Sequence, residues 1–273
     1  MTTQEEKGRA FRALHERERA FVIPNPWDIG TARLLANLGF EALATTSAGS
    51  ALSMGLPDGR MGRDRTMAHV QAIAGATELP VSGDLENGFG DEPETAAETI
   101  RLAAAAGLVG GSIEDATGNP EQPIYEKGHA VERVRAAAEA VRALPFLFTL
   151  TARCENYLYG RADLDNTIQR LQAYQEAGAD VLYAPGIRTR EEISGLVRSV
   201  ERPVNVLMGL KGATFSVAEL SEIGVRRISV GSALIRAALS AFLDAAREMR
   251  DQGTFSFAEH TVPLRDLNTL FGG

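Results

Sequence analysis

The chain is poor in the residues and segments that mark several common classes of protein. Cys154 is the one cysteine among 273 residues, so no disulfide can form within the chain and nothing indicates an oxidising compartment. No apolar run approaches the roughly 18 residues of a membrane-spanning helix, and the first twenty residues lack the apolar core of a secretory signal. We therefore expect a cytoplasmic protein with no membrane partner.

Positive charge is also scarce. There are 28 Lys and Arg residues against 36 Asp and Glu, which gives a formal net charge of -8 and a pI near 5.2. This balance argues against a nucleic-acid partner. The four histidines have no ligand-like spacing, which argues against a zinc site. A small anionic substrate stays compatible with the charge, because a local cation can reverse the field in one pocket.

What the chain does contain is a regular alternation of short apolar runs and helical patterns. The predicted strands are 20–24, 42–46, 80–84, 109–114, 146–152, 181–184, 203–208 and 227–230. The predicted helices between and after them are 29–38, 63–77, 92–106, 130–144, 164–177, 190–200, 217–223 and 233–250. Glycines that follow four of these helices mark their ends: Gly39, Gly107, Gly178 and Gly224.

Eight such units with mostly short connections predict an α/β fold, a (β/α)8 TIM barrel that forms a single domain over residues 1–273. An open Rossmann sheet is disfavoured because the sequence after the first strand, Asn25-Pro-Trp-Asp-Ile-Gly, lacks a G-x-G-x-x-G turn. An N-terminal helix should precede the barrel. The C-terminal segment 250–273 is too apolar for a free tail, so we expect it to pack on the barrel or on a neighbouring subunit. Two longer connections, 47–62 and 116–129, follow strand ends and are candidates for a lid.

Polar residues gather where the predicted strands end, which in a barrel is the catalytic face. They are Trp27, Asp28, Thr45, Thr46, Ser47, Asp84, Glu86, Glu114, Asp115, Arg153, Glu155, Tyr183, Asn205 and Ser232. Asp84 and Glu86 point to the same side at a spacing of two, and Glu114 ends the next strand. Carboxylates in this arrangement predict a Mg²⁺ site, with Mn²⁺ as a substitute. In the alternative reading, Asp84 caps a turn and Glu86 is solvated.

Arg153 ends an otherwise apolar strand, where a charge is costly to bury unless it is paired. It could bridge to Glu155 or Glu114, or hold a substrate carboxylate or phosphonate with its planar fork. We favour the second role. Cys154 alternates to the other side and is expected to be a packed thiol.

Several motifs together resemble the isocitrate lyase/phosphoenolpyruvate mutase superfamily over roughly residues 20–240. They are Asn25-Pro-Trp-Asp, Thr45-Thr-Ser-Ala-Gly, Gly55-Leu-Pro-Asp, Asp84-Leu-Glu-Asn-Gly-Phe-Gly, Gly111-Ser-Ile-Glu-Asp and Ala152-Arg-Cys-Glu. The resemblance implies a (β/α)8 barrel, Mg²⁺-dependent chemistry on an α-keto acid or its enolate, and a homo-oligomer, a dimer or tetramer that exchanges its last helix.

The resemblance also implies roles for individual residues. Asp84 would bind the metal directly, while Glu86 and Glu114 would hold it through its waters. Asp58 would be the loop acid beside the substrate, and Arg153 would bind the substrate. The backbone of Ser47 and Ala48 would hold the substrate carboxylate. At neighbouring strand ends, Trp27, Thr46 and Asn205 are expected to contact the substrate.

The chain departs from the superfamily patterns at the 116–129 connection. The lyases carry a Lys-Lys-Cys-Gly-His loop whose cysteine supplies a proton, and no cysteine is present here. The phosphonomutases carry a lysine and an asparagine on this loop and a histidine after the sixth strand, where this chain has Tyr183-Ala-Pro. Tyr125, Lys127 or His129 could substitute, and we take Tyr125 as the catalytic candidate.

Three functions follow from these observations. The favoured one is a Mg²⁺-dependent lyase or decarboxylase that cleaves a C–C bond of a small 2-oxo or 2-hydroxy dicarboxylate through an enolate. The second is mutase or hydrolase chemistry on the C–P bond of phosphonopyruvate. The third is a barrel that binds a keto acid without turning it over.

Overall fold

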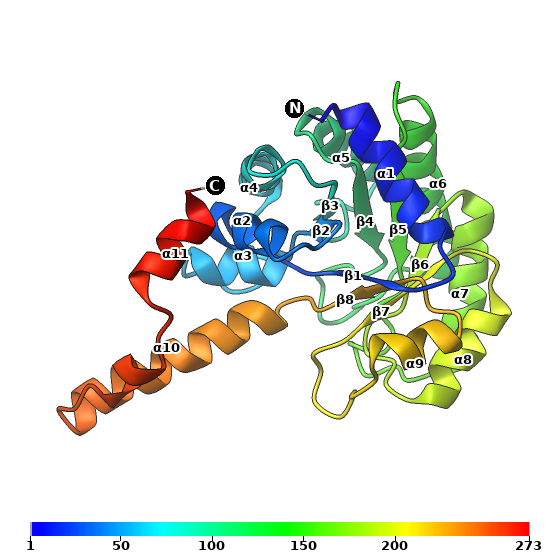
Figure 1. The fold of residues 1–273 in the computed structure, drawn as a ribbon. Helices are drawn as coiled ribbons and strands as arrows, with labels where there is room; N and C mark the ends of the chain where they lie inside the picture. Colours follow the sequence, from blue (N-terminus) through cyan, green and yellow to red (C-terminus); the bar gives the residue numbers. More distant parts are fainter. Residues whose placement is uncertain (1, 273) are drawn as a thin grey trace.

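A barrel of parallel strands forms the centre of the molecule (Figure 1). The computed structural model describes residues 2–272 and contains, within them, an eight-stranded sheet with the order β1-β8-β7-β6-β5-β4-β3-β2. The strands are β1 Phe21–Ile23, β2 Leu43–Ala44, β3 Val81–Asp84, β4 Gly110–Glu114, β5 Thr149–Arg153, β6 Val181–Tyr183, β7 Val204–Leu207 and β8 Arg227–Ser229. Each lies at a position that the sequence predicted, and the fold is confirmed as a single-domain (β/α)8 TIM barrel.

The barrel closes between the first strand and its two neighbours. β1 pairs with β8 in parallel, with Phe21 opposite Arg227. On its other side, the backbone N–H of Ala44 donates to the Pro24 carbonyl at 3.1 Å. The Asn25 side chain adds a bond from Nδ2 to the Thr45 carbonyl at 3.0 Å. The β1–β2 seam is therefore held by few bonds, while the other strand pairs have regular ladders.

Helices surround the strands and follow the predicted alternation. They are α1 Gln4–Glu16, α2 Ile29–Asn37, α3 Ser47–Ser53, α4 Arg63–Gly75, α5 Pro93–Ala105, α6 Lys127–Arg142, α7 Leu164–Ala177, α8 Arg190–Ser199, α9 Val217–Glu222, α10 Ala233–Asp251, η1 Ser256–His260 and α11 Leu264–Phe271. The predicted N-terminal helix is α1, which begins with a capping box between Thr3 and Glu6.

The two longer connections contain more structure than a simple loop. The 47–62 connection begins with α3, whose first turn is capped by the Thr46 hydroxyl accepting from the Gly49 N–H at 3.2 Å. The 116–129 connection folds back on itself through an antiparallel bridge between Ala116 and Ile124, and α6 then begins at Lys127. His129 accordingly lies in the first turn of a helix.

The apolar core lies between the strands and the surrounding helices, where outward-facing strand residues such as Ile113, Leu150 and Leu182 are buried. A second cluster lies beneath the barrel, where Phe11 and Leu14 of α1 pack on Phe21 and Ile23 of β1. Inside the barrel itself many of the side chains are polar, and this interior positions the candidate site.

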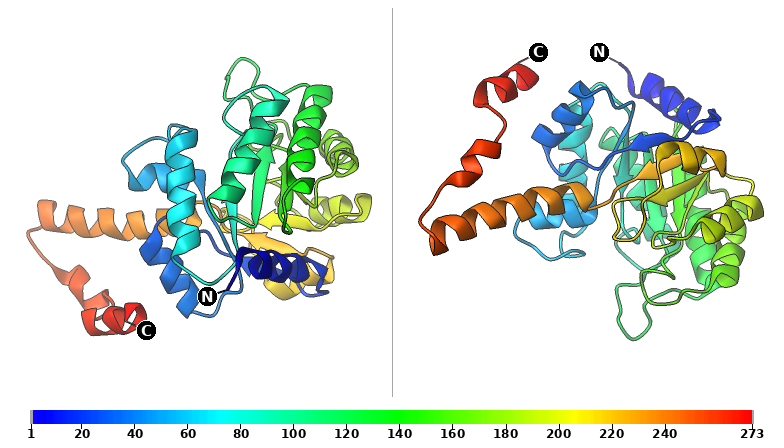
Figure 2. Two further views of the ribbon diagram at one scale, coloured as in Figure 1. Left: turned by 90° about the horizontal axis from the view of Figure 1, so that it is seen from above. Right: turned by 60° about the horizontal axis from the view of Figure 1, so that its bottom comes forward.

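The C-terminal arm, residues 233–272, leaves the barrel. α10 runs away from the strands, and the chain then turns back so that α11 lies beside α2 (Figures 1 and 2). Of the residues described in α10, Ile235 is the one that is buried. Phe242 is 67% exposed and Leu264 in α11 is 73% exposed. The arm therefore presents apolar side chains that this chain does not cover.

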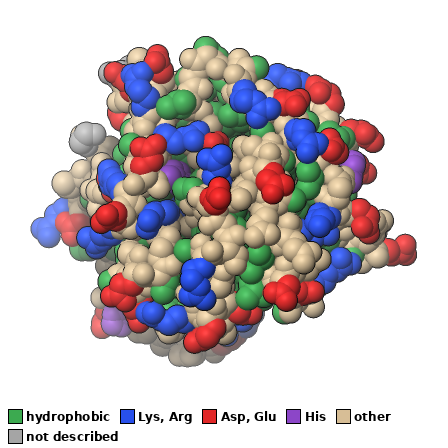
Figure 3. Space-filling view, turned by 90° about the vertical axis from the view of Figure 1, so that its right-hand side faces the viewer, with side chains coloured by type: hydrophobic (Ala, Val, Ile, Leu, Met, Phe, Trp, Pro, Cys, Tyr) green, Lys and Arg blue, Asp and Glu red, His purple; other side chains and the backbone are tan. Residues whose placement is uncertain are grey.

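On the face that carries α7 and α8, acidic and basic side chains are interspersed, with no large area of one sign (Figure 3). None of the helices formed by residues 2–272 combines the length and the apolar character needed to cross a membrane.

Candidate active site

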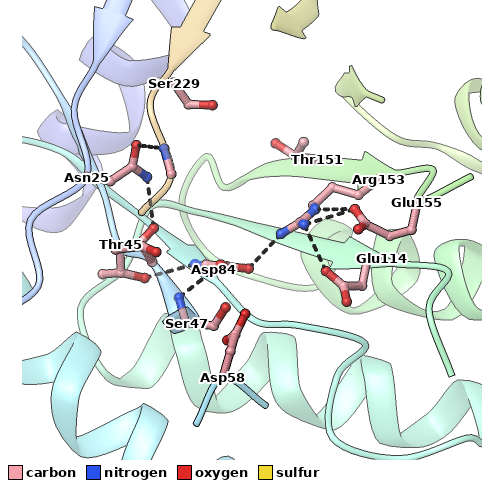
Figure 4. A network of polar contacts seen from close by, with 12 residues as sticks. Asn25, Thr45, Ser47, Asp58, Asp84, Glu114, Thr151, Arg153, Glu155 and Ser229 are labelled. Atoms are coloured by element: carbon pink, nitrogen blue, oxygen red, sulfur yellow. Dashed lines mark hydrogen bonds and ion pairs between the residues drawn. The ribbon is translucent and has the colours of Figure 1, made fainter. Parts of the chain in front are cut away.

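The Arg153 side chain lies at the centre of a cluster of carboxylates at the C-terminal ends of β3, β4 and β5 (Figure 4). Its Nη1 donates to Asp84 Oδ1 at 2.9 Å, and its Nη2 lies 3.2 Å from Glu114 Oε2. Its Nε and Nη2 lie 3.0 and 2.9 Å from Glu155 Oε1. Burial alone would lower the pKa of Arg153, but these three carboxylates raise it well above its ordinary value. Arg153 thus makes both of the bridges that the sequence left open, and a further one to Asp84.

Asp84 is fixed on its other side by β2 and α3. The Ser47 backbone N–H donates to Asp84 Oδ2 at 3.0 Å, and the Asp84 N–H donates to the Thr45 hydroxyl at 2.9 Å. Asn25 accepts the N–H groups of Val230 and Gly231 at 2.9 Å while donating to the Thr45 carbonyl. Strands β8, β1, β2 and β3 are thereby joined around the position of Asp84.

Glu86 and Glu114 are adjacent in space. The Glu114 N–H donates to the Glu86 carbonyl at 3.0 Å, and Glu86 has a left-handed backbone with φ of 50°. Such a φ is uncommon outside glycine and is retained mainly where the surroundings fix it. Burial, then Asp84 and Asp58, raise the pKa of Glu86 to about 7. Burial also raises the pKa of Glu114 well above its ordinary value.

A wide cleft opens above these carboxylates, and a smaller cavity continues from it into the barrel. The cleft, about 1480 Å³, is lined by Ser47, Asp58, Glu86, Glu114 and Arg153 among others. The inner cavity, about 170 Å³, shares Ser47, Asp58 and Arg153 with it. The structure therefore brings the loop acid Asp58 to the same opening as the strand-end residues. Burial, then Asp84, raise the pKa of Asp58.

The donor set fits a divalent cation. Within residues 2–272, Glu86 Oε1 is buried with no hydrogen-bond partner. Asp84, Glu114 and Glu155 pair with Arg153, and Asp58 and Glu86 line the same cleft. Carboxylate oxygens suit Mg²⁺ and Mn²⁺. Across the same described residues, no three Asp, Glu, His or Cys side chains converge on one point that could hold a metal, because Arg153 lies between Asp84 and Glu114. The metal roles of Asp84, Glu86 and Glu114 stay predictions.

A second layer of buried groups holds Glu155 and the 116–126 segment. Asp115 accepts the Glu155 N–H at 2.8 Å and the Tyr174 hydroxyl at 2.6 Å, and it pairs with Arg170 at 3.2 Å. Arg170 also donates to the Tyr125 carbonyl at 3.0 Å. Cys154 is fully buried beside this layer, as expected of a packed thiol.

Tyr125 lies away from the cleft lining. Its hydroxyl donates to Asp91 Oδ1 at 2.6 Å and accepts from Asn87 Nδ2 at 3.3 Å, and the Arg133 guanidinium lies 4.5 Å from its ring centre. Burial and the bond to Asp91 raise the pKa of Tyr125 to about 12. These contacts do not bring the hydroxyl to the reacting groups, so its position gives no support to the predicted catalytic role.

The other predicted substrate contacts are divided between the cavity and the helix caps. Thr46, Ala48 and Asn205 line the inner cavity. Trp27 is partly buried, and its carbonyl oxygen lies 2.8 Å from His69 Nε2, within hydrogen-bond distance. Asp28 caps α2 through the Thr31 N–H at 2.7 Å and does not join the site.

Some residues that line the inner cavity were not predicted as site residues. Asn25, which ties β8 to β2, was seen only as part of a motif, and Arg227 and Ser229 were read as ordinary strand residues. A signal for the last two was present, because residues at a spacing of two on a barrel strand face the same side. A charged residue and a serine on the inner face of β8 indicate a polar interior.

Known proteins agree with this architecture. The family model described as phosphoenolpyruvate phosphomutase matches residues 11–250. Oxaloacetate decarboxylase of Pseudomonas paraeruginosa (strain DSM 24068 / PA7) is 30% identical over 247 residues, which are 88% of this chain and 84% of that protein. 2-Methylisocitrate lyase of Escherichia coli (strain K12) is 29% identical over 269 residues, 95% of this chain and 90% of that protein.

A solved structure of a lyase/mutase candidate from Burkholderia cenocepacia J2315 is 62% identical and superposes with a TM-score of 0.97, over 99% of this chain and 97% of that one. These matches agree with one another and with the barrel fold of this chain. The chain belongs to the phosphoenolpyruvate phosphomutase family, within the isocitrate lyase/phosphoenolpyruvate mutase superfamily.

Proposed function

We propose that this protein is a Mg²⁺-dependent lyase or decarboxylase that cleaves a C–C bond of a small 2-oxo or 2-hydroxy dicarboxylate through an enolate. The observation that carries the proposal is the cluster of carboxyl groups at the opening of the barrel, where Asp84, Glu114 and Glu155 pair with Arg153 and Asp58 and Glu86 line the same cleft. Relatives named as a 2-methylisocitrate lyase and an oxaloacetate decarboxylase support C–C cleavage of small carboxylates.

Asp84, Glu86 and Glu114 would hold the Mg²⁺ ion, or Mn²⁺ in its place. Asp84 would bind it directly and the two glutamates through its waters, as the resemblance implies. When bound, the ion supplies a Lewis acid for the negative charge that develops as the bond next to the carbonyl breaks.

The chain's own residues would orient the substrate. Ala48 lies in the first turn of α3, where backbone N–H groups have no acceptor within the helix, so its N–H can donate to a substrate carboxylate. The Ser47 N–H beside it donates to Asp84 Oδ2, and Ser47 itself lines the inner cavity. Arg153 is held by three carboxylates and lines the same cavity as Ser47 and Ala48, so its positive charge lies near the expected position of the substrate carboxylate. Holding a substrate in a reactive orientation itself lowers the barrier.

Asp58 is the residue we assign to proton transfer at the enolate carbon. It lines both the cleft and the inner cavity, and its raised pKa brings it closer to the range in which a carboxyl group exchanges protons at neutral pH. Tyr125, the other candidate, has its hydroxyl bonded to Asp91. Asp58 is therefore favoured over Tyr125.

Oxalate, which mimics an enolate, tests the proposal. We expect the wild-type protein to bind oxalate only with Mg²⁺ or Mn²⁺ present, and Asp84→Asn to weaken binding by about a hundredfold or more. Asp244→Asn, a change at an exposed position on α10, is the matched control and should leave binding unchanged. Equal oxalate affinity in wild type and Asp84→Asn, measured by titration calorimetry, would show that Asp84 does not bind the metal.

Phosphonate chemistry is the second candidate, favoured by the name of the family model. Phosphorus NMR of an incubation with phosphonopyruvate separates the two, because a C–C lyase leaves that signal unchanged. Metal-linked binding without turnover, across C–C and C–P substrates alike, would favour a barrel that binds keto acids without catalysis.

We also propose that the protein is a homo-oligomer, a dimer or tetramer, in which residues 250–273 pack on or exchange with a neighbouring subunit. The exposed side chains of Phe242, Phe255, Val262 and Leu264 support this arrangement. A large apolar surface left uncovered on a single chain is typical of a protein–protein interface.

A further inference from the structure

Arg227 places a second guanidinium inside the barrel, deeper than Arg153. It begins β8, and its side chain is 5% exposed. Its Nε donates to Asn205 Oδ1 at 3.0 Å on the neighbouring strand β7. Its Nη2 donates to Thr151 Oγ1 at 3.0 Å on β5, which is not adjacent to β8 in the sheet. The side chain therefore crosses the interior and forms the floor of the inner cavity.

The charge of Arg227 has no counter-charge. None of the ion pairs formed among residues 2–272 includes it, and its Nη1 is buried without a hydrogen-bond partner. Burial lowers the pKa of Arg227 to about 10. A buried charge without a partner is costly, and a guanidinium N–H left unsatisfied adds to that cost.

A purely structural floor would not require this residue. The groups around Arg227 are neutral: Asn205 accepts from Arg227 Nε and donates to Ser229 Oγ, and Thr151 accepts from Arg227 Nη2. Even a buried ion pair can often be replaced by apolar side chains of similar volume with no loss of stability, and a buried charge without a partner is costlier than a pair. The positive charge of Arg227, together with the unpaired Nη1, therefore points to a ligand that supplies the missing negative charge.

The cavity above Arg227 offers room and polar walls for such a ligand. It has a volume of about 170 Å³ and reaches from Ser47 and Asp58 at the opening down to Arg227. That space holds several water molecules or a short carbon chain with a carboxylate. Hydroxyl groups of Ser82, Ser112 and Ser229 line its walls. Two arginines line this cavity. Arg153, at the opening, is bonded to three carboxylates (Figure 4), whereas among the described residues Arg227 has no carboxylate partner and has one guanidinium nitrogen, Nη1, without a hydrogen bond.

We infer that Arg227 forms the floor of an anion subsite that receives the second carboxylate of a dicarboxylate substrate while the first lies at the opening beside Ser47. This inference rests on the proposed function and identifies the residue that recognises the second carboxylate of its substrate. A charge-assisted bond from guanidinium to carboxylate is stronger than one between neutral groups. The subsite therefore makes the protein select dicarboxylates over monocarboxylates of equal length.

Malate and 2-hydroxybutyrate are the matched probes, because they have the same chain length and differ in the second carboxylate. With Mg²⁺ present, we expect the wild-type protein to bind malate about ten- to a hundredfold more tightly. Arg227→Met should reduce this preference to about twofold or less, and Arg227→Lys should retain part of it. Arg226→Met is the control, because Arg226 donates to the Glu18 carbonyl at 2.7 Å outside the cavity and should not affect the preference.

Oxalate separates this inference from the proposed function. If wild type and Arg227→Met both bind oxalate with Mg²⁺ and both prefer malate equally, the subsite is wrong while the metal site stands. If wild type binds no oxalate, the proposed function fails. A wild-type crystal soaked in malonate then decides the subsite separately. Carboxylate density against Arg227 Nη1 supports it, and ordered water alone at saturating malonate overturns it.

Discussion

The two arginines inside the barrel differ in how their charge is compensated. Arg153 contacts three carboxylates, whereas Arg227 contacts an amide and a hydroxyl. The first is held by the protein itself. The hydrogen-bonding groups of Arg227 are only partly paired, as expected of a side chain that binds a ligand. The same residue type therefore serves two purposes within one interior.

Removal of the Arg153 charge should destabilise the protein. Arg153→Met leaves Asp84, Glu114 and Glu155 buried and unpaired, and we expect it to lower the free energy of unfolding by roughly 3–5 kcal/mol. The loss should be smaller at pH 5 than at pH 8, because carboxyl groups with raised pKa values take up protons. Urea unfolding of wild type and Arg153→Met at pH 5 and at pH 8 measures this difference in stability.

Arg135→Met is the control for this comparison. Arg135 forms an exposed ion pair with Glu132 on α6. Such pairs contribute roughly 0–1 kcal/mol. Similar losses in the two variants would show that the Arg153 contacts stabilise the fold no more than a surface pair does.

His15 should make the stability of the fold depend on pH. Burial, followed by the charge of Arg227, lowers the pKa of His15 from about 6.5 to about 3. The pKa of His15 in the folded state lies below its pKa in the unfolded state. The stability that comes from keeping His15 buried and neutral is therefore fully present above pH 6.5 and is lost as pH falls toward 3. The slope in that window should be roughly 1.4 kcal/mol per pH unit.

The His15→Phe variant isolates this contribution. Phenylalanine cannot titrate and keeps a ring against Phe11 and Phe21, which contact His15 edge to face. The difference in unfolding free energy between wild type and His15→Phe should change between pH 4 and pH 7. Parallel curves over that range would contradict the assigned pKa of His15.

Single residues of the site could be predicted from the strand pattern, but their partners could not. Asp84, Glu114 and Arg153 were found because polar residues at strand ends face one opening. Which carboxylates share the guanidinium depends on side-chain reach across three strands, which the sequence does not encode locally. Arg227 was missed because an arginine at the start of a strand ordinarily faces solvent, and only the closed barrel brings it inside.

Among the elements, α1 depends on a close backbone contact beneath the barrel. A Cβ at Gly8 would lie 2.3 Å from the Leu147 carbonyl oxygen, which precedes β5. Gly8→Ala would gain helix propensity of about 1 kcal/mol. The clash with backbone should outweigh that gain, because overpacking of this kind costs roughly 1–3 kcal/mol or more. We expect a lower melting temperature by calorimetry.

Gly128→Ala on α6 is the matched change. Its added Cβ would meet no described atom within 4 Å, so the variant should be as stable as wild type or slightly more stable. A melting temperature for Gly8→Ala at or above that of Gly128→Ala would show that α1 can move away from residue 147.

The elements themselves were largely predictable, with an instructive exception. The eight strands were found because their apolar runs are buried against helices. The helix α3 was missed, since Ser47-Ala-Gly-Ser-Ala-Leu-Ser has no amphipathic period. It forms because the Thr46 hydroxyl caps it and because it packs under the site, with Gly49, Ser50 and Ala51 buried. Such tertiary causes are not visible in the local sequence.

For the whole molecule, the C-terminal arm predicts self-association. We expect wild-type protein at micromolar concentration to be a dimer or tetramer by light scattering. Phe242→Glu places a charge at the one phenylalanine of α10, which is 67% exposed, and should shift the protein toward the monomer, because a charge at an apolar interface must be desolvated. Glu248 is a poor control site because it bonds to residues 254–257, so Asp244→Asn serves instead. A monomeric wild type would refute the packing role of the arm.

The closure of the barrel has a consequence for the order in which the chain can fold. β1 has its ladder with β8 and is joined to β2 by little more than the Ala44 N–H bond. On a ribosome that adds 5–20 residues per second, β8 emerges about 10–40 s after β1. During that interval Phe21 and Ile23 have α1 as cover but no strand partner for pairing. The first strand is thus the segment of a nascent chain that a chaperone would protect. It is also the last strand to complete its pairing, because its partner β8 is synthesised last.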